Sequence, residues 1–415
     1  MIPSRCDSRS SIPVKRIRHD EDIHSRSRIR SGIIVQRSIP YEARRRLVSE
    51  EVYKPRILWR QLYRRRLTIG LLHCEQRLGS SCGTSQIGGT FSSTQIYYSS
   101  ILTVLQNHNS FSNGRPWPSY VAQYSGANVY NYAVSGAACS NDVTPVNFPA
   151  INGPYPAVEQ YEIPAYIADS KYVDEDGTNF LNTPPDETVY SIFIGTNDLG
   201  NYALLTDEQQ PGTNIVNYTD CVVRALGSIY DNGGRHFVLQ NVAPLNLSPQ
   251  YGLPGKGGLP TSQYWLDKSS HTTEISYKMA EYVSLVNAVY KYQTPYLFEV
   301  AKRFPGAHIA LMDMHGLVSR KHQGGLFYQQ RLTIFFSLLQ ITDIYNNPSQ
   351  YLNGSAPLNV TGFASSDMKA ANTTDKDSFL WYDELHPGEQ ADRVIAREFL
   401  GVVAGDSKWA TYWSG

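Results

Sequence analysis

The stretch VYSIFIG, residues 189–195, is a short and mainly apolar run that ends in a glycine. Such a run, bounded by a turn residue, is typical of a β-strand that is buried on both faces. Two similar runs follow in the chain, one from His236 to Leu239 and one in HIALMDM, residues 308–314. We therefore expect three buried strands that belong to one sheet.

Helices are expected between these runs and after them. Apolar residues recur at helical spacing in 214–230, which DNGG follows and ends, and again between Ile275 and Val286. A last helix is expected from about Pro387 to Val403. Strands that alternate with such helices predict an α/β fold, in which helices cover both faces of a parallel sheet. In sheets of this kind ligands bind at the carboxyl ends of the strands.

The chain has 415 residues, of which 41% are hydrophobic, and this is enough for a sizeable core. Its zero formal net charge hides an asymmetry, because residues 1–77 hold 19 of the 37 basic residues and only 8 of the 37 acidic ones. The arginines there follow no sustained apolar period, which predicts a disordered tail or the translation of a mis-read first coding segment. An arm that binds nucleic acid is the alternative, but no motif supports it, and we expect no nucleic-acid partner.

The expected domain organisation follows from this asymmetry. Residues 1–110 are expected to be an arginine-rich segment that is disordered or mis-read, and residues 111–415 are expected to form one α/β domain. A basic and then apolar stretch at 320–341 breaks the strand–helix rhythm, and we interpret it as an irregular insertion, which a translated intron would explain. No run of 18 apolar residues occurs in the sequence, so we expect no membrane span.

The sequence carries features both for and against export. Residues 1–30 lack the continuous apolar stretch of a secretory signal. A cluster of N-x-S/T sequons in the second half of the chain nevertheless favours a secreted, glycosylated protein. These sequons begin at Asn217, Asn246, Asn353, Asn359 and Asn372.

Two of the five cysteines, Cys139 and Cys221, lie in the regular part of the chain. They form one disulfide if the protein is exported, or they stay as two buried thiols, and the sequence leaves both alternatives open. No C-x-x-C pair occurs, so we expect no structural zinc site.

Asp383 and His386 stand three residues apart in WYDELHPGEQ (381–390), just before the last expected helix. A carboxylate bonded to one imidazole nitrogen fixes the tautomer and leaves the other nitrogen to take a proton from a nucleophile. The structural alternative is that Asp383 or Glu384 caps the helix and that His386 is a surface turn residue. A glycosidase that pairs the carboxylates of Asp383 and Glu384 is disfavoured, because adjacent side chains in a turn tend to point apart.

Two further segments follow expected strands. In FIGTNDLG (193–200), the amide of Asn197 could donate to a developing oxyanion, or the Asn-Asp pair could simply cap a helix. In NYAVSGAACSND (131–142), the chain turns at Gly136, whose lack of a side chain would let its backbone N–H approach a substrate. Taken singly, this second segment is an ordinary turn.

Together these segments resemble the SGNH (GDSL-type) esterase and lipase superfamily, and within it the fungal acetylesterases of carbohydrate esterase family 16. The resembling stretches include NGRPWPSYVAQYSGANVYNYAVSGAACSNDVTP, FIGTNDLG and YDELHPG, and they cover most of 113–404. G-x-N-D after a strand, followed by D-x-x-H-P before the last helix, is a fairly specific combination. The family fold is a three-layer α/β/α sandwich with a parallel, flavodoxin-like sheet, which agrees with the strand–helix alternation.

The resemblance implies a role for each matching residue. Asp383 and His386 resemble the acid and base of a catalytic triad, with His386 activating a serine. Gly136, through its backbone N–H, and Asn197, through its side-chain amide, resemble the oxyanion donors. The implied reaction is ester hydrolysis through an acyl-enzyme, and it needs no metal or cofactor.

The nucleophile departs from the family pattern. The family carries its serine in a G-D-S sequence at the end of the first strand, but residues 1–135 contain no G-D-S. The G-D-S at Gly405–Ser407 lies downstream of the histidine and cannot supply a first-strand serine. RLTIGLL (66–72) is the best match to that strand, which makes Ser81 the candidate nucleophile, against an unremarkable serine-rich loop.

We therefore expect a secreted serine esterase that removes acetyl groups, with a small-molecule or oligosaccharide ester as its substrate. The alternative is a catalytically inactive, carbohydrate-binding relative. This alternative follows if the chain lacks the nucleophilic serine, because the remaining groups retain little power of acyl transfer.

Overall fold

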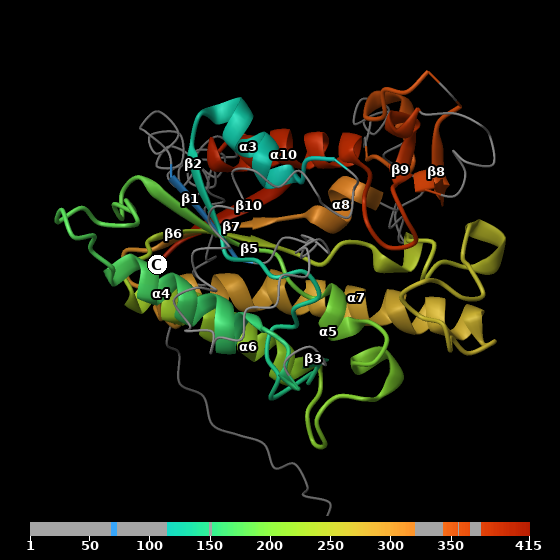
Figure 1. The fold of residues 1–415 in the computed structure, drawn as a ribbon, viewed down its shortest axis with the longest axis horizontal. Coiled ribbons are helices and arrows are strands. Elements are labelled where there is room, and N and C mark those ends of the chain that lie inside the picture. Colours follow the sequence, from blue (N-terminus) through green and yellow to red (C-terminus); the bar gives the residue numbers. More distant parts are fainter. Residues whose placement is uncertain (1–67, 73–113, 149–151, 320–342, 356, 366–374) are drawn as a thin grey trace, which may run out of the picture. The chain divides into compact units, whose positions relative to one another are not determined.

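The computed structural model describes residues 68–72, 114–148, 152–319, 343–355, 357–365 and 375–415 (Figure 1). The chain divides into two units, Met1–Leu47 and Val48–Gly415. Every described residue belongs to the second unit.

The main sheet of the described residues contains the strands β1 (Thr68–Leu72), β2 (Asn128–Asn131), β5 (Thr188–Ile192), β6 (His236–Gln240), β7 (His308–Met312) and β10 (Ala410–Ser414). Their order across the sheet is β10-β7-β6-β5-β1-β2. Neighbouring strands from β2 to β7 pair in parallel, which confirms the expected parallel sheet. The three strands predicted from apolar runs are β5, β6 and β7.

Two features of the sheet differ from the sequence-based expectation. β10 pairs antiparallel with β7, so an antiparallel edge strand that we did not expect completes the sheet. β1 lies within the segment 1–110 that we expected to be disordered or mis-read, but it confirms RLTIGLL (66–72) as a strand of the sheet, where it lies between β2 and β5. The sheet therefore begins before residue 111. The expected insertion at 320–341 lies outside the described residues.

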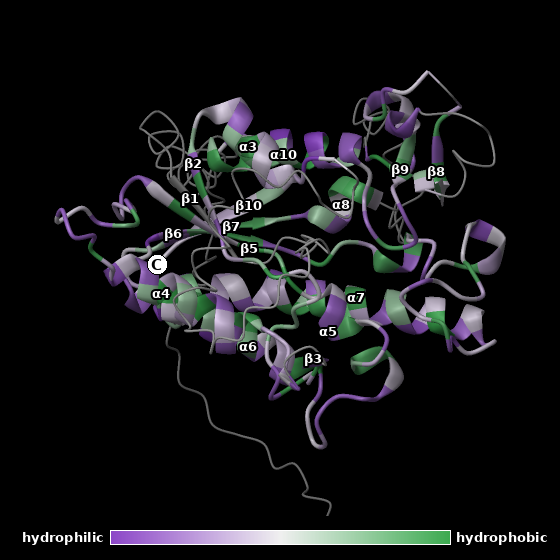
Figure 2. Cartoon of the chain, in the orientation of Figure 1, coloured by the Kyte–Doolittle hydropathy of each residue, from purple (hydrophilic) through white to green (hydrophobic). Residues whose placement is uncertain are grey.

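Helices cover both faces of the sheet, as Figure 1 shows. On one face lie α3 (Trp117–Ser125), α8 (Met314–Ser319) and α10 (Glu389–Val403), and on the other lie α4 (Ile163–Lys171), α6 (Ile215–Asp231) and α7 (Thr272–Pro295). Figure 2 shows hydrophilic and hydrophobic residues alternating along α6, α7 and α10, as expected for helices that bury one face. The three-layer α/β/α arrangement is confirmed.

Alternate side chains of one strand enter two separate cores. In β5, Val189 packs into the core beneath α3 and α10, whereas Tyr190 and Ile192 pack into the core beneath α6 and α7. All five residues of β5 are buried, because a parallel strand covered by helices on both faces has no side exposed to water. This explains why the strand reads as a continuous apolar run.

The last helix begins two residues later than we expected. Pro387 forms an isolated antiparallel bridge with Trp381, and Gly388 is the N-cap of α10. Trp381 ends the short strand β9 (Phe379–Trp381), which pairs with β8 (Asn359–Phe363). A second two-stranded sheet pairs β3 (Asn147–Phe148) with β4 (Gly153–Pro154). Within the described part of the chain, none of the helices has the length and hydropathy needed to span a bilayer.

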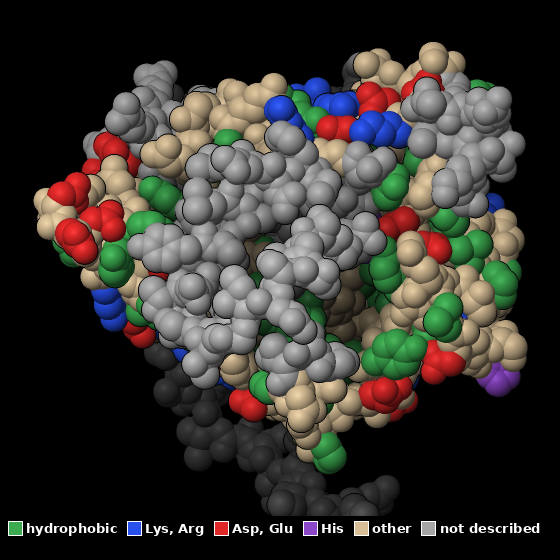
Figure 3. Space-filling model, viewed as in Figure 1, with side chains coloured by type: hydrophobic (Ala, Val, Ile, Leu, Met, Phe, Trp, Pro, Cys, Tyr) green, Lys and Arg blue, Asp and Glu red, His purple; other side chains and the backbone are tan. Residues whose placement is uncertain are grey.

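A buried carboxylate ties the start of α10 to α3 and to the segment that leads into α3. Glu389 accepts hydrogen bonds from the hydroxyl of Tyr120 at 2.6 Å and from the backbone N–H of Arg115 at 3.2 Å, and it pairs with Lys376 at 2.5 Å. Figure 3 shows acidic and basic side chains next to one another at the top of the view, where Figure 1 places α3 and α10. Burial alone raises the pKa of Glu389, but the hydrogen bonds from Lys376 and Tyr120 outweigh it and lower that pKa to about 2.

We expect Glu389→Gln to lower the free energy of unfolding at pH 7 by about 1–3 kcal/mol, because buried partners lose a charged acceptor. The folded-state pKa of about 2 lies below the value of about 4.3 for an unfolded Glu. The carboxylate therefore stabilises the fold fully above about pH 4.3, and this contribution is lost as the pH falls towards 2. Urea unfolding at pH 7 and at pH 3 should show a smaller difference between variant and wild type at pH 3.

The exposed Glu175 offers a matched control, and Glu175→Gln should unfold like the wild type at both pH values. A loss of stability in Glu389→Gln that is equal at pH 7 and pH 3 would contradict the role given to this carboxylate.

Candidate active site

The carboxyl ends of β2, β1 and β5 lie side by side at one edge of the sheet. The parallel register places Leu71 opposite Asn131 of β2, and Leu72 opposite Ile192 of β5. The chain leaves β1 for β2 on one side and reaches β5 on the other, so the connections diverge at this point. A divergence of this kind opens a crevice outside the strand ends, where ligands of α/β proteins bind.

The loop after β2 carries Gly136. Its backbone has φ = 85°, which glycine adopts readily and other residues rarely do. A Cβ atom at this position would lie 3.3 Å from the hydroxyl oxygen of Tyr155. That hydroxyl donates a hydrogen bond of 2.5 Å to the carbonyl oxygen of Ser135. The positive φ favours a glycine here, and any Cβ would also crowd the hydroxyl of Tyr155.

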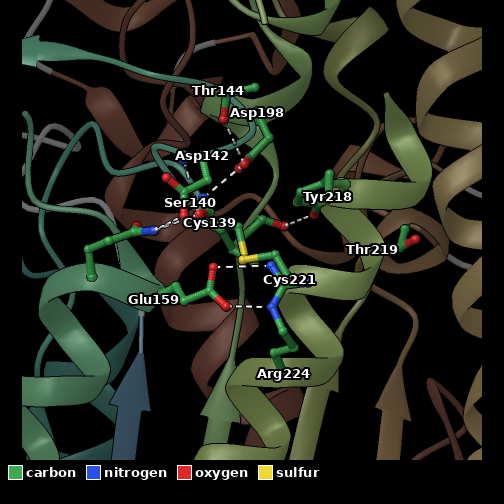
Figure 4. Close-up of a disulfide and its surroundings, with 12 residues drawn as sticks. Cys139, Ser140, Asp142, Thr144, Glu159, Asp198, Tyr218, Thr219, Cys221 and Arg224 are labelled. Atoms are coloured by element: carbon green, nitrogen blue, oxygen red, sulfur yellow. Dashed lines mark hydrogen bonds and ion pairs between the residues drawn. A yellow bond between two sulfur atoms is a disulfide. The ribbon is translucent and has the colours of Figure 1, made fainter. Parts of the chain in front are cut away.

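Contacts from two other elements hold this loop. The buried carboxylate of Glu162 accepts a hydrogen bond of 2.9 Å from the N–H of Val134. Figure 4 shows a disulfide between Cys139 and Cys221, which joins the loop to α6. The structure thus decides between the two alternatives that the sequence left open for these cysteines. A loop fixed in this way presents its backbone N–H groups in one geometry.

Asn197 lies beyond the carboxyl end of β5, in the single turn α5 (Thr196–Leu199). The turn starts at Gly195 with φ = 131°, where a Cβ atom would lie 2.5 Å from the hydroxyl oxygen of Tyr218. The half-buried amide of Asn197 donates a hydrogen bond of 3.0 Å to the carbonyl oxygen of Ala137. A side-chain amide has two N–H donors, so this contact orients the group and leaves a second donor direction.

The neighbouring Asp198 is fully buried and joins the two loops. Its carboxylate accepts hydrogen bonds from the N–H of Cys139 at 2.8 Å and from the hydroxyl of Thr144 at 3.2 Å (Figure 4). The Asn-Asp pair therefore does more than cap a helix. Asp198 fixes the loop that carries Gly136, and Asn197 bonds to the same loop.

Asp383 and His386 lie in a tight turn between β9 and α10. The N–H of Tyr382 donates to the carbonyl oxygen of His386 at 2.8 Å and closes the turn. One oxygen of Asp383 accepts the N–H groups of Leu385 at 2.9 Å and His386 at 2.7 Å, which is the local pattern of an aspartate turn. The same carboxylate lies 2.9 Å from the imidazole Nδ1 of His386.

This carboxylate sets the tautomer of the imidazole. Burial by itself raises the pKa of Asp383, but the hydrogen bond and charge of His386 lower it, and the net pKa lies below its usual value. An ionised carboxylate can only accept, so Nδ1 carries the hydrogen and Nε2 is the basic nitrogen. Both residues are buried, which is inconsistent with the alternative of a surface turn histidine.

A second turn docks against this one and was not found from the sequence. Ser262 and Trp265 form a two-way backbone bridge, with Gln263 and Tyr264 at its tip. The hydroxyl of Tyr264 donates to Asp383 at 2.7 Å, and its ring meets the imidazole of His386 edge-on, with 5.3 Å between centroids. No local pattern marks Tyr264, because its partner is 119 residues away.

The loop after α5 also bonds to the turn that carries Tyr264. The amide of Asn201 donates to the carbonyl oxygen of Tyr264 at 2.9 Å and accepts from Gln250 at 2.9 Å. The N–H of Gln250 in turn donates to the carbonyl oxygen of Glu384 at 2.7 Å. The Asp383–His386 turn is therefore tied to loops that follow β5 and β6.

The other expected residues fall elsewhere. Ser81 lies outside the described residues. Ser407 is buried after α10, where its hydroxyl accepts the N–H of Trp409 at 3.0 Å. The carboxylate of Glu384 bonds to Gln263 at 2.7 Å, whereas that of Asp383 bonds to His386, so the two carboxylates engage different partners.

Residues 83–399 match the family model of the GDSL-like lipase/acylhydrolase domain. The chain is 38% identical to an acetylesterase of Hypocrea jecorina over 308 residues, which cover 73% of this chain and 80% of that protein. It is 24% identical to the thermolabile hemolysin of Vibrio parahaemolyticus serotype O3:K6 (strain RIMD 2210633) over 326 residues, which cover 76% of this chain and 60% of the hemolysin.

Two solved structures give weak matches. A GDSL-like lipase from Bacteroides thetaiotaomicron VPI-5482 matches with a TM-score of 0.30 and 9% identity, over 88% of this chain and 95% of that one. A carbohydrate esterase matches with a TM-score of 0.24 and 13% identity, over 54% of this chain and 56% of that one. The sequence matches, and not these structural scores, carry the family assignment.

We expect the double replacement Cys139→Ser/Cys221→Ser to lower the free energy of unfolding. The cysteines are 82 residues apart, and the chain-entropy model gives about 4 kcal/mol for a loop of this length. Urea unfolding of both proteins measures the change. A peptide that joins the two cysteines in an unreduced digest is the direct check, and alkylation of both thiols without a reductant would refute the bond.

Proposed function

This chain belongs to the GDSL-like lipase/acylhydrolase family and is a carboxylic ester hydrolase, and we propose that Asp383 and His386 activate a serine for attack on acetyl esters. The observation that carries the proposal is the buried carboxylate of Asp383 on Nδ1 of His386, in a turn tied to the loops after β5 and β6. This arrangement keeps Nε2 basic, as a general base requires.

In the proposed reaction, Nε2 of His386 takes the proton of the serine hydroxyl while the serine oxygen attacks the ester carbonyl carbon. The carbonyl oxygen becomes an oxyanion, to which the N–H of Gly136 and the amide of Asn197 donate. The C–O bond to the alcohol then breaks, and His386 returns the proton to the leaving alcohol. Water, activated by the same imidazole, hydrolyses the acyl-enzyme and restores the serine.

Ser81 is the proposed nucleophile. It follows β1, which ends at Leu72 between the strands that precede Gly136 and Asn197. A nucleophile that comes from the end of β1 is thus flanked by one oxyanion donor on each side. The order of the chain also places Ser81 before Gly136, Asn197 and His386, as in the family that the sequence resembles.

We propose acetylated carbohydrate as the substrate. The relative at 38% identity is an acetylesterase, and an exposed aromatic residue follows Asn201, whose amide bonds to the turn that carries Tyr264. Tyr202 follows Asn201, its side chain is 45% exposed, and its hydroxyl bonds to the carboxylate of Asp267. Its backbone has φ = 60°, which costs a non-glycine residue about 1–2 kcal/mol. The ring faces water, its hydroxyl is anchored to Asp267, and its backbone is strained. An exposed and anchored ring of this kind suits the stacking of a sugar.

Secretion is proposed with the substrate. A disulfide between Cys139 and Cys221 persists in an oxidising compartment. Among the sequons, Asn353 has an exposed side chain, which suits a glycan, and Asn372 lies outside the described residues. Both features agree with an extracellular esterase.

Replacement of the base tests the mechanism. With a chromogenic acetate as substrate, we expect His386→Ala to lower kcat/KM by at least about 10³-fold, because the general base is lost. Asn197→Ala should lower kcat by about 10²-fold with a small change in KM, because an oxyanion donor acts mainly in the transition state. Steady-state rates of the purified variants measure both effects.

The exposed histidine at the start of α7 provides a matched control, and His271→Ala should keep the wild-type rate. A serine-directed phosphonate followed by peptide mapping should label Ser81. Label on a serine beyond residue 136 would contradict the proposed order of the site. Absence of hydrolysis in every protein, including the wild type, would favour an inactive carbohydrate-binding relative.

Replacement of Tyr202 tests the substrate class. We expect Tyr202→Ala to raise KM for an acetylated xylo-oligosaccharide about tenfold, because a stacking surface is lost, and to leave KM for a chromogenic acetate unchanged. Tyr124→Ala removes a ring of similar exposure, 46%, from α3 and should change neither value. An equal effect of Tyr202→Ala on both substrates would argue against a sugar-binding ring.

A further inference from the structure

Tyr264 contacts both members of the acid–base pair at once. Its hydroxyl donates to the Asp383 oxygen Oδ2 at 2.7 Å, and its ring stands at 76° to the imidazole plane of His386, with 5.3 Å between centroids. The other Asp383 oxygen, Oδ1, accepts the backbone N–H groups of Leu385 and His386. The two carboxylate oxygens are therefore oriented by donors from two different turns.

The turn that carries Tyr264 is itself rigidly held. Trp265 is 4% exposed and packs against Tyr251, and the buried hydroxyl of Ser262 donates to the side chain of Gln250 at 2.8 Å. The carbonyl of Tyr264 accepts the amide of Asn201 at 2.9 Å. These contacts already order Tyr264. It can therefore orient the carboxylate of Asp383 with little further loss of conformational entropy.

We propose that Tyr264 is a positioning residue for the Asp383–His386 pair, an inference that rests on the proposed function of that pair. Its hydroxyl holds the Asp383 carboxylate in the plane that faces Nδ1, and its ring restricts rotation of the imidazole. Tyr264 touches neither the serine nor the ester in this proposal. It acts through Asp383, as groups behind a ligating or catalytic histidine generally do.

The hydroxyl also adjusts the basicity of His386. A hydrogen bond from Tyr264 takes up part of the negative charge of Asp383, which then stabilises the imidazolium less. Removing the hydroxyl leaves more of that charge to His386, so the pKa of the imidazole rises. As the pH falls, a general base with a higher pKa becomes protonated at a higher pH and stops accepting protons. The acid limb of the pH–rate profile therefore moves to higher pH.

Other charged groups around the pair are engaged elsewhere. The carboxylate of Glu384 accepts from the side-chain amide of Gln263 at 2.7 Å. The ammonium of Lys268 donates to the carbonyl oxygens of Gln250 at 2.7 Å and Leu259 at 2.6 Å. On α10, Glu389 pairs with Lys376. A change in the pKa of His386 on removal of the Tyr264 hydroxyl is thus separate from the bonds that these charged groups make.

Tyr264→Phe removes the hydroxyl and keeps the ring. With a chromogenic acetate we expect kcat to fall about tenfold with KM within about twofold, since the base is less well aligned. The acid limb of kcat/KM should move up by about 0.5–1 pH unit. Tyr264→Leu, which also removes the ring, should lower kcat further. Tyr277→Phe, which removes the hydroxyl of an exposed tyrosine on α7, should keep both the rate and the pH profile.

A second measurement does not depend on activity. The pKa of His386 in ¹³C-histidine-labelled protein can be followed by NMR, with the signal assigned from its absence in His386→Ala. We expect this pKa to be higher in Tyr264→Phe than in the wild type by about 0.5–1 unit. An unchanged His386 pKa together with an unchanged kcat would overturn the role of Tyr264.

The two readouts separate this inference from the proposed function. If His386→Ala keeps the full hydrolytic rate, the proposed function fails, whatever Tyr264→Phe does. If His386→Ala is inactive while Tyr264→Phe keeps the wild-type rate, pH profile and imidazole pKa, only the positioning role fails.

Discussion

Parallel hydrogen bonding places β1 between β2 and β5, and the site depends on this placement. Because parallel strands end at the same edge, the loops that follow the three strands must start side by side. Gly136 follows β2 and Asn197 follows β5, so the two residues proposed as oxyanion donors flank the end of β1. The sheet thus brings together positions that are 61 residues apart in the chain without any direct contact between their strands.

The sheet alone does not bring the Asp383–His386 turn to this edge, since that turn follows the small strand β9. Polar contacts do so instead. Asn201 reaches from the loop after α5 to the carbonyl of Tyr264, and Gln250 reaches from the loop after β6 to that of Glu384. These bonds lie in a partly buried region, where an unmade hydrogen bond is costly. The turn is therefore fixed by these polar contacts as well as by the packing of Leu385 against the core.

Features of the fold that depend on neighbouring residues could be predicted from the sequence. The strands β5, β6 and β7 could be predicted because strands buried on both faces give apolar runs. The contact of Asp383 with His386 could be predicted because the two residues are only three positions apart in one turn. Pro387 misled the prediction of the helix start, since a proline suits both a first helical turn and the bridge with Trp381 that it makes here.

Features that depend on distant pairing could not be predicted in this way. No pattern near Cys139 or Cys221 predicts their bond. The strand β10 likewise depends on hydrogen bonds to β7, which lies about 100 residues earlier in the chain. Tyr264 likewise acquires its contact from a partner on another turn. The positions of Gly136 and Asn197 were expected from a family resemblance, whereas the carboxylate of Asp198 that fixes their loops is evident only in three dimensions.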